Sequence, residues 1–370
     1  MELKLINKCG MKRVNVYHSL FMIIAYLFIV VSSLGQNADN LKLKDYRPVS
    51  IFKVPVTNVI KAKYPAIEMH VHVARTDQAI AQNIKVMDAC GIEKAIILTG
   101  ASGTRFDTIA NMYAKYGNRF ELWCGFDNTG YDKPGYGPEA VKELERCFKK
   151  GAKGVGELMY KGKGVAPGSG RTMMLPDDPR VDLLFEKCAE LGMPVNLHVS
   201  EDKWMYEKID STNDGLINAA TWNVNMDNGS KTHEELIDIL ENTLKKHPKT
   251  TFIAAHLANC CADLSVLGKF LDKYPNLFAD IAARFGEIAP IPKYVHEFIE
   301  KYQDRLVYGT DMTALNEKIY RVTFRILETA DEHFYEIFWI NYHWPLYGLY
   351  LSDKTLKKLY RDNAIKIINR

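Results

Sequence analysis

The chain has 370 residues, of which 47% are hydrophobic and 25% are charged, as is typical of a folded globular protein. Its net charge is only +3, with both signs interspersed along the sequence, so we expect no nucleic acid partner and no attraction to an anionic lipid surface. This length can bury a large core, and an α/β barrel of this size folds as one domain.

The N-terminal residues follow the pattern of a secretory signal. Four basic side chains within residues 4–13 precede an apolar run at 20–31, and the small residues Ser33 and Gly35 come next. The apolar run is shorter than the ~20 residues of a comfortable membrane span. We therefore predict that residues 1–36 are a signal peptide, that the protein is periplasmic or secreted, and that it keeps no stable membrane span after cleavage. An uncleaved signal anchor is the alternative.

Residues 37–64 are polar and irregular and are interpreted as an N-terminal extension. After them, short apolar runs alternate with amphipathic stretches. The runs predict eight strands at residues 66–73, 94–99, 120–127, 154–159, 194–199, 251–256, 277–282 and 305–311. The stretches predict helices at 77–90, 104–116, 137–149, 181–191, 232–246, 263–273 and 292–301, with further helices between 316 and 368.

Eight such strand–helix units predict a parallel sheet closed into a single (β/α)8 TIM-like barrel over residues 65–370. A doubly wound open sheet is the rival, because periodicity alone cannot show closure. Two long segments, 160–180 and 200–231, follow predicted strands and would lie at the catalytic end of a barrel. They are interpreted as lids, or else as tolerated surface insertions.

The first predicted strand ends in His70-Val71-His72. Residues two apart on a strand face the same side, so both imidazoles can bind one metal ion. Neutral imidazole nitrogen is a good ligand for zinc and similar ions. Taken alone this pair is a weak signal, because two core or surface histidines give the same string.

Later strand ends strengthen the metal-site interpretation. Glu157 lies near the end of the fourth predicted strand, His198 closes the fifth, His256 the sixth and Asp311 the eighth. In a barrel, all these groups would meet at the carboxyl ends of the strands, where barrel enzymes carry their chemistry.

This order of residues resembles the amidohydrolase superfamily, and most of all its amidohydrolase-related branch (family 2), which includes aminocarboxymuconate-semialdehyde decarboxylase-like enzymes. The resemblance covers about residues 65–370. It is also carried by His247-Pro248 with Ala255-His256-Leu257, Tyr274-Pro275-Asn276-Leu277 with Asp280, Asp304-Arg305 with Gly309-Thr310-Asp311, and Leu359-Tyr360 with Asn363-Ala364. These segments indicate the family and not the substrate.

The resemblance implies roles for single residues. His70, His72 and His198 would bind the metal, and Asp311 would bind it or take a proton from the bound water. His256 would bind a second metal or act as a general acid–base. Glu157 would bridge two metals, as a Glu can in TatD-like nucleases, or would lie behind the ligands or face the substrate.

The function expected from the resemblance is that of a metal-dependent hydrolase acting on an amide, ester or lactone bond of a small substrate. A divalent ion, zinc by expectation and one or two per chain, lowers the pKa of bound water from 15.7 to about 7. A non-oxidative decarboxylase on the same fold is the alternative. A non-enzymatic metal binder and a TatD-like nuclease rank lower, the latter because the chain shows no basic stripe for phosphate backbones.

Four arginines follow predicted strands or lie in the long loops, and a guanidinium can grip a carboxylate with two hydrogen bonds. Arg284 and Arg75 are the candidates for binding an anionic substrate; Arg105 and Arg171 are further ones. A surface or ion-paired arginine is an equally good interpretation of each. The aromatic stretch 333–351 is expected to pack the last helices on the barrel. The oligomeric state stays open, a homodimer included.

Overall fold

The protein was analysed as a computed structural model, which describes residues 38–369 except for 161–173, 225, 227–229 and 337–342. The predicted signal at 1–36, and Arg171 in the first long loop, lie outside the described residues. Residues 38–47 belong to a separate unit and contain two short 3-10 turns, Ala38–Asn40 and Leu43–Asp45. No helix in the described part of the chain combines the length and the apolar character needed to cross a bilayer.

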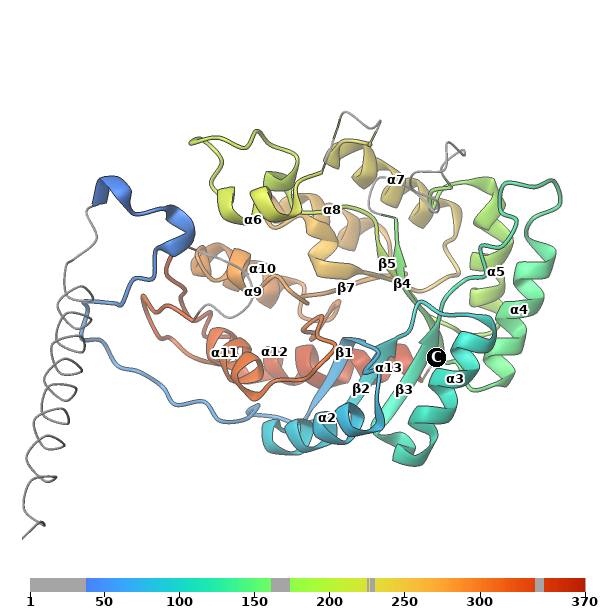
Figure 1. The fold of residues 1–370 in the computed structure, drawn as a ribbon, viewed down its shortest axis with the longest axis horizontal. Helices are drawn as coiled ribbons and strands as arrows, with labels where there is room; N and C mark the ends of the chain where they lie inside the picture. The colour runs from blue at the N-terminus through green and yellow to red at the C-terminus, as the bar shows by residue number, and fades with distance from the viewer. Residues whose placement is uncertain (1–37, 161–173, 225, 227–229, 337–342, 370) are drawn as a thin grey trace, which may run out of the picture. The chain divides into compact units, whose positions relative to one another are not determined.

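Within residues 48–370, eight parallel strands form one sheet in the order of the chain (Figure 1). They are β1 (Ala66–His72), β2 (Ile92–Leu98), β3 (Phe120–Cys124), β4 (Gly154–Met159), β5 (Val195–His198), β6 (Phe252–Ala254), β7 (Leu277–Asp280) and β8 (Leu306–Val307). The last strand returns to the first: Met69 N donates to Tyr308 O at 2.9 Å and His72 N to Met312 O at 2.8 Å. These bonds bring the two edges together and confirm the predicted barrel over the open sheet.

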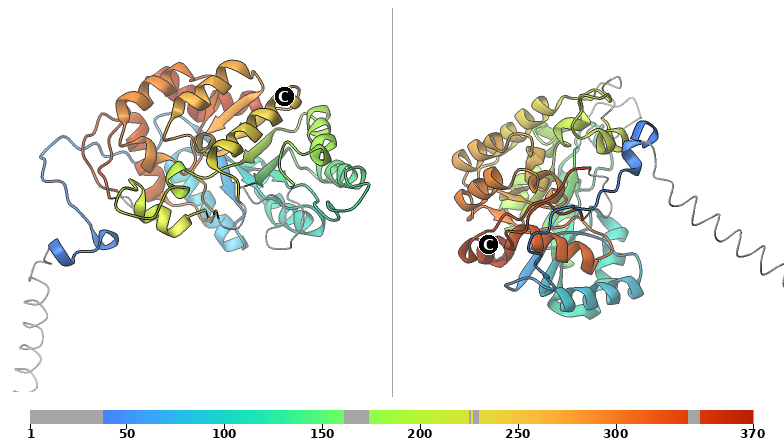
Figure 2. Two further views of the ribbon diagram at one scale, coloured as in Figure 1. Left: turned by 90° about the horizontal axis from the view of Figure 1, so that it is seen from above. Right: turned by 90° about the vertical axis from the view of Figure 1, so that its left-hand side faces the viewer.

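The helices surround the strands, as both views of Figure 2 show. They are α2 (Asp77–Cys90), α3 (Gly103–Tyr113), α4 (Pro138–Lys149), α5 (Asp182–Glu190), α6 (Leu216–Trp222), α7 (His233–Lys246), α8 (Leu264–Lys273), α9 (Phe285–Ile288), α10 (Pro292–Lys301), α11 (Glu317–Glu328), α12 (Asp353–Lys357) and α13 (Asn363–Ile368). Local sequence sets several of their ends. Thr232 and Glu235 form a capping box at the start of α7, and Gly91 ends α2 with a left-handed φ of 78°.

Apolar side chains fill the inside of the barrel. Ile67, Met69, Trp123 and Phe278 belong to one buried cluster with others from the strands, and α13 packs Ile367 against it. The polar side chains of the candidate site lie at or just beyond the carboxyl ends of the strands, where barrel enzymes carry their chemistry.

Four strands, β3, β6, β7 and β8, end two to four residues earlier than their sequences predict. The sixth and eighth apolar runs predict strands up to His256 and Asp311, whereas β6 stops at Ala254 and β8 at Val307. Both His256 (φ 58°) and Asp311 (φ 64°) adopt the left-handed conformation, which ends extended pairing. His256 therefore lies in the turn Ala255–Asn259 directly after β6, and Asp311 lies four residues beyond the end of β8.

The N-terminal extension makes polar contacts with the segment that follows α11. Thr57 in the extension donates from its backbone N and its hydroxyl to the Asp331 carboxylate at 2.8 and 2.6 Å. The segment after β5 contains a 3-10 turn, Lys203–Met205, and α6. The cysteines of the described part of the chain are all buried and free.

Candidate metal centre

The two imidazoles at the end of β1 both face Asp311. His70 is fully buried, whereas the His72 side chain is 30% exposed. Asp311 Oδ1 lies 2.8 Å from His72 Nε2 and 3.5 Å from His70 Nε2. The alternation of a strand accounts for the shared direction, because residues two apart lie on one face.

The Glu157 carboxylate, from β4, lies between two pairs of imidazoles. Its Oε1 is 2.5 Å from His198 Nδ1 and 3.4 Å from His256 Nε2. The same oxygen is 3.8 Å from His70 Nε2, and Oε2 is 3.6 Å from His72 Nε2. One buried carboxylate therefore lies within 4 Å of nitrogen atoms of four imidazoles, which come from β1, from β5 and from the turn after β6.

His256 begins a short left-handed turn. Four successive residues other than glycine, His256 to Asn259, have φ values between 54° and 58°. This conformation is costly for residues with a Cβ and is typically retained at functional sites. The His256 ring donates from Nδ1 to Ala282 O at 2.9 Å, so its Nε2 is the nitrogen that faces Glu157.

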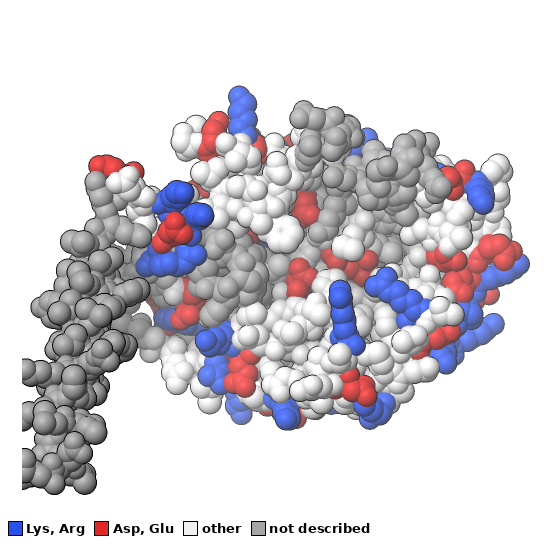
Figure 3. Space-filling view, in the orientation of Figure 1, with Lys and Arg blue, Asp and Glu red and all other residues white. Residues whose placement is uncertain are grey.

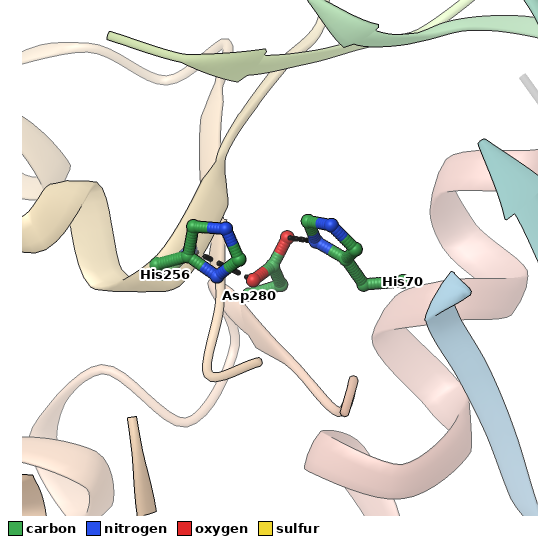
Figure 4. A group of neighbouring side chains, drawn as sticks. All are labelled: His70, His256 and Asp280. Atoms are coloured by element: carbon green, nitrogen blue, oxygen red, sulfur yellow. Dashed lines mark hydrogen bonds and ion pairs between the residues drawn. The ribbon is translucent and has the colours of Figure 1, made fainter. Parts of the chain in front are cut away.

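Asp280, at the end of β7, also belongs to the cluster, although the sequence analysis assigns it no role beyond its place in the family pattern. Its buried carboxylate contacts His70 and His256 (Figure 4). The signal was the same as for Asp311: an acidic residue at the end of an apolar strand.

The donor atoms fit a bound divalent ion. Within the described residues, three groups hold ligand atoms within 4.8 Å of one another: His70, His256 and Asp280; His70, His72 and Glu157; and Glu157, His198 and His256. The Nε2 atom of His70 is buried and makes no hydrogen bond there. A buried polar atom of this kind calls for a partner, and a metal ion is one that imidazole nitrogen binds well.

The charges of the site also favour a cation. Burial alone would lower the pKa of His70, but the carboxylates of Asp280, Glu157 and Asp311 outweigh it and raise that pKa to about 10. Burial alone would raise the pKa values of Glu157 and Asp311, yet the neighbouring imidazoles keep both below their usual range. Carboxylates that stabilise a proton on a buried ring also stabilise a metal ion in its place.

The predicted substrate-binding arginines differ in their surroundings. Arg284 is 6% exposed, and its guanidinium pairs with Asp202 and with Glu287, the latter at 2.9 Å. Arg75 and Arg105 are exposed. Contact of Arg284 or Arg75 with a substrate stays a prediction.

A cavity of about 570 Å³ lies beside the loop after β5. Trp204 from this loop, Glu287 and Trp344 are among the residues that line it, and the two indole rings are 5.9 Å apart. Its size is that of a small-molecule site. Figure 3 shows acidic and basic side chains interspersed over the visible face, without a continuous basic area.

A barrel with clustered imidazoles and carboxylates at the carboxyl ends of its strands defines a metal-dependent enzyme. The chain matches the amidohydrolase family over residues 67–370 and belongs to that family. The predicted resemblance is thereby confirmed at the level of the family. No curated protein sequence matches the chain.

Solved structures share the fold at low identity. A dihydroxybenzoic acid decarboxylase from Polaromonas, with bound manganese, is 15% identical, with a TM-score of 0.53 over 83% of this chain and 98% of its own. A 5-carboxyvanillate decarboxylase from Novosphingobium aromaticivorans, with manganese, is 14% identical, with a TM-score of 0.52 over 85% and 100%. A dihydroorotase from Campylobacter jejuni is 12% identical, with a TM-score of 0.50 over 86% and 87%. At these identities the likeness is one of fold.

Proposed function

We propose that the protein is a hydrolase that uses two divalent ions to cleave an amide, ester or lactone bond of a small molecule. The observation that carries this proposal is the position of Glu157. Its carboxylate contacts one pair of imidazoles, His70 and His72, and a second pair, His198 and His256. A carboxylate between two sets of nitrogen ligands suits a bridging role between two ions.

The ligand sets follow from these contacts. His70, His72 and Asp311 would hold one ion, His198 and His256 the other, and Glu157 would contact both. Imidazole-rich sites suit zinc, so zinc is the ion we expect. Two of the similar structures contain manganese, which is a property of those proteins and does not identify the ion of this chain.

The chemistry divides between the ions and the side chains. Divalent ions bound there would lower the pKa of water and polarise the oxygen of the scissile bond. The Asp311 side chain is 30% exposed, so it can reach the reacting atoms, take a proton from water and pass it to the leaving group. Asp280 is fully buried and is excluded from this task. Arg75, exposed just after β1, would bind an anionic group of the substrate.

Decarboxylation is the second candidate, favoured by the fold shared with the two decarboxylases. Such a reaction needs one ion and no attacking water. The number of ions and the fate of water oxygen therefore separate the two reactions.

The first experiment measures metal per chain by plasma mass spectrometry, on protein purified without chelator. We expect about two equivalents in the wild type and about one or fewer in Glu157→Gln, which keeps the shape of the side chain but loses its charge. The matched control is Glu139→Gln, since the Glu139 side chain is 81% exposed on α4 and pairs only with Lys142 in the described contacts.

One equivalent in the wild type, unchanged in Glu157→Gln and His256→Ala, would overturn the two-ion site and favour the decarboxylase. With a substrate found by screening lactones, amides and aromatic acids, reaction in ¹⁸O-labelled water gives the second readout. Hydrolysis transfers the label to the product, whereas decarboxylation releases carbon dioxide and leaves the product unlabelled.

A further inference from the structure

Asp280 accepts four hydrogen bonds: from residues within β1 and β5, and from residues just after β6 and β7. Its Oδ2 accepts from His70 Nδ1 and from Asn196 Nδ2, both at 2.9 Å. Its Oδ1 accepts from the backbone N of His256 at 2.9 Å and of Ala282 at 3.1 Å. The carboxylate is completely buried, and each oxygen serves two donors, so its hydrogen-bonding capacity is used up.

The contact with His70 fixes the position of a proton. A carboxylate that receives only donors must meet a protonated nitrogen, so His70 Nδ1 carries hydrogen. The neutral ring then has its lone pair on Nε2, the atom that faces Glu157 and Asp311. A partner on one ring nitrogen thus determines which nitrogen can bind a metal.

The other oxygen acts on the backbone. The bond from His256 N lies at the start of the left-handed turn, and Ala282, the second donor, offers its own carbonyl to His256 Nδ1. Asp280 therefore fixes the backbone of His256 and also the backbone of Ala282, which binds the His256 ring. Together these contacts direct His256 Nε2 toward Glu157.

We propose that Asp280 is a positioning residue that directs the Nε2 atoms of both His70 and His256 toward Glu157, through the proton of the first and the backbone of the second. This inference rests on the proposed function, because it assigns Asp280 to the support of that metal centre. Asp280 itself need not touch the substrate or an ion.

The substitution Asp280→Asn separates the effect on the His70 proton from the effect on the backbone of His256 and Ala282. The amide oxygen of Asn can still accept from His256 N and Ala282 N, but its NH2 group would face His70 Nδ1. His70 would then have to accept there, which moves its hydrogen to Nε2 and blocks the atom that would bind the metal. Asn196 can rotate its amide to present oxygen to the new donor, so the fold can be kept.

The test compares zinc affinity, by competition with a chromophoric chelator, and the imidazole N–H resonances in proton NMR spectra. For Asp280→Asn we expect zinc affinity to fall about tenfold to a hundredfold, as is usual when the partner of a metal-binding imidazole is lost. We also expect the His70 Nδ1–H resonance to vanish. Asn196→Ala, which removes the other donor from the same oxygen, should keep that resonance and stay within about threefold of wild-type affinity.

Wild-type affinity and an unchanged resonance in Asp280→Asn would overturn the proposal, as would an equal loss of affinity in Asn196→Ala. If Asp280→Asn does not fold, two-bond ¹⁵N–¹H correlations of the wild type decide: hydrogen on His70 Nε2 instead of Nδ1 would overturn it. A wild type that binds no zinc would refute the proposed function alone, since the resonances of the metal-free protein still test the His70–Asp280 bond.

Discussion

At the scale of single residues, Gly309 packs so closely against His70 that a side chain at position 309 has no space. A Cβ atom added to Gly309, which follows β8, would lie 2.8 Å from the His70 Cβ and 3.2 Å from the Ala282 Cβ. The first distance is shorter than side-chain carbons tolerate, so a larger residue must displace the His70 backbone or ring. Glycine at 309 is therefore part of what positions this imidazole.

We predict that Gly309→Ala weakens zinc binding about tenfold or more and lowers the free energy of unfolding by about 1–3 kcal/mol, a usual cost of overpacking. The measurements are zinc competition and urea unfolding. The control is Gly268→Ala in α8, where the added Cβ would meet the Tyr302 hydroxyl at 2.8 Å, away from the described metal centre. Equal zinc affinities in the two variants would contradict the argument.

Some residues of the site could be predicted from the sequence, and others could not. Glu157, His198 and Asp311 could be selected because each is polar and lies at or near the end of an apolar run. Nothing in the sequence could show that Arg284 pairs with Asp202 and Glu287, because partners distant in the chain meet only when loops after different strands fold together. The position of Asp280 between His70 and His256 depends in the same way on the closure of the barrel.

At the scale of elements, the helix pair α3–α4 is joined by one charged contact. Glu143 on α4 receives hydrogen bonds from Arg146 and from the backbone N of Gly103, at the start of α3. Arg146 extends the contact to Asp107 on α3 at 2.8 Å. The hydrogen bonds from Arg146 lower the pKa of Glu143 to about 2.

The lowered pKa of Glu143 predicts a pH-dependent contribution to stability. A carboxyl group whose pKa is depressed by folding stabilises the fold above its unfolded pKa, and this is lost as the pH falls toward about 2. Because Arg146 is partly exposed, we expect only about 1 kcal/mol at pH 7 from Glu143→Gln. Urea unfolding of both proteins between pH 7 and pH 3 should show the difference shrinking below pH 5. A difference that grows as the pH falls would refute the assignment, and Glu139→Gln again serves as the control.

Elements also divide into those that local patterns predict and those they do not. The spans of α2 and α7 match the prediction at both ends or within one residue, because capping residues and apolar periodicity agree there. The predicted ends of β3, β6, β7 and β8 lie two to four residues too late. An apolar run indicates burial, and it cannot distinguish a strand from the left-handed turn that begins near His256.

At the scale of the whole molecule, the candidate ligands come from β1, β4 and β5 and from the segments that follow β6 and β8. Ions bound there would connect parts of the barrel that otherwise meet only through strand pairing. A ligand that binds only the folded state stabilises it by about 4 kcal/mol at a thousandfold excess over its Kd.

We therefore predict that removing metal with dipicolinate lowers the Tm by on the order of 5–10 °C, and that added zinc restores it. Far-UV circular dichroism at 20 °C should not change, because the apolar core remains. Differential scanning calorimetry measures the effect, and the shift should be smaller in Glu157→Gln. A Tm insensitive to chelation would mean that metal does not connect the strands.

The pairing of His72 with Asp311 joins residues that are 239 positions apart in the chain. During synthesis the first two imidazoles leave the ribosome long before the aspartate that they face. A nascent chain that still lacks its eighth strand has no enclosed centre in which to retain an ion. The His72–Asp311 side of the centre is therefore complete only once the segment after β8 has joined β1.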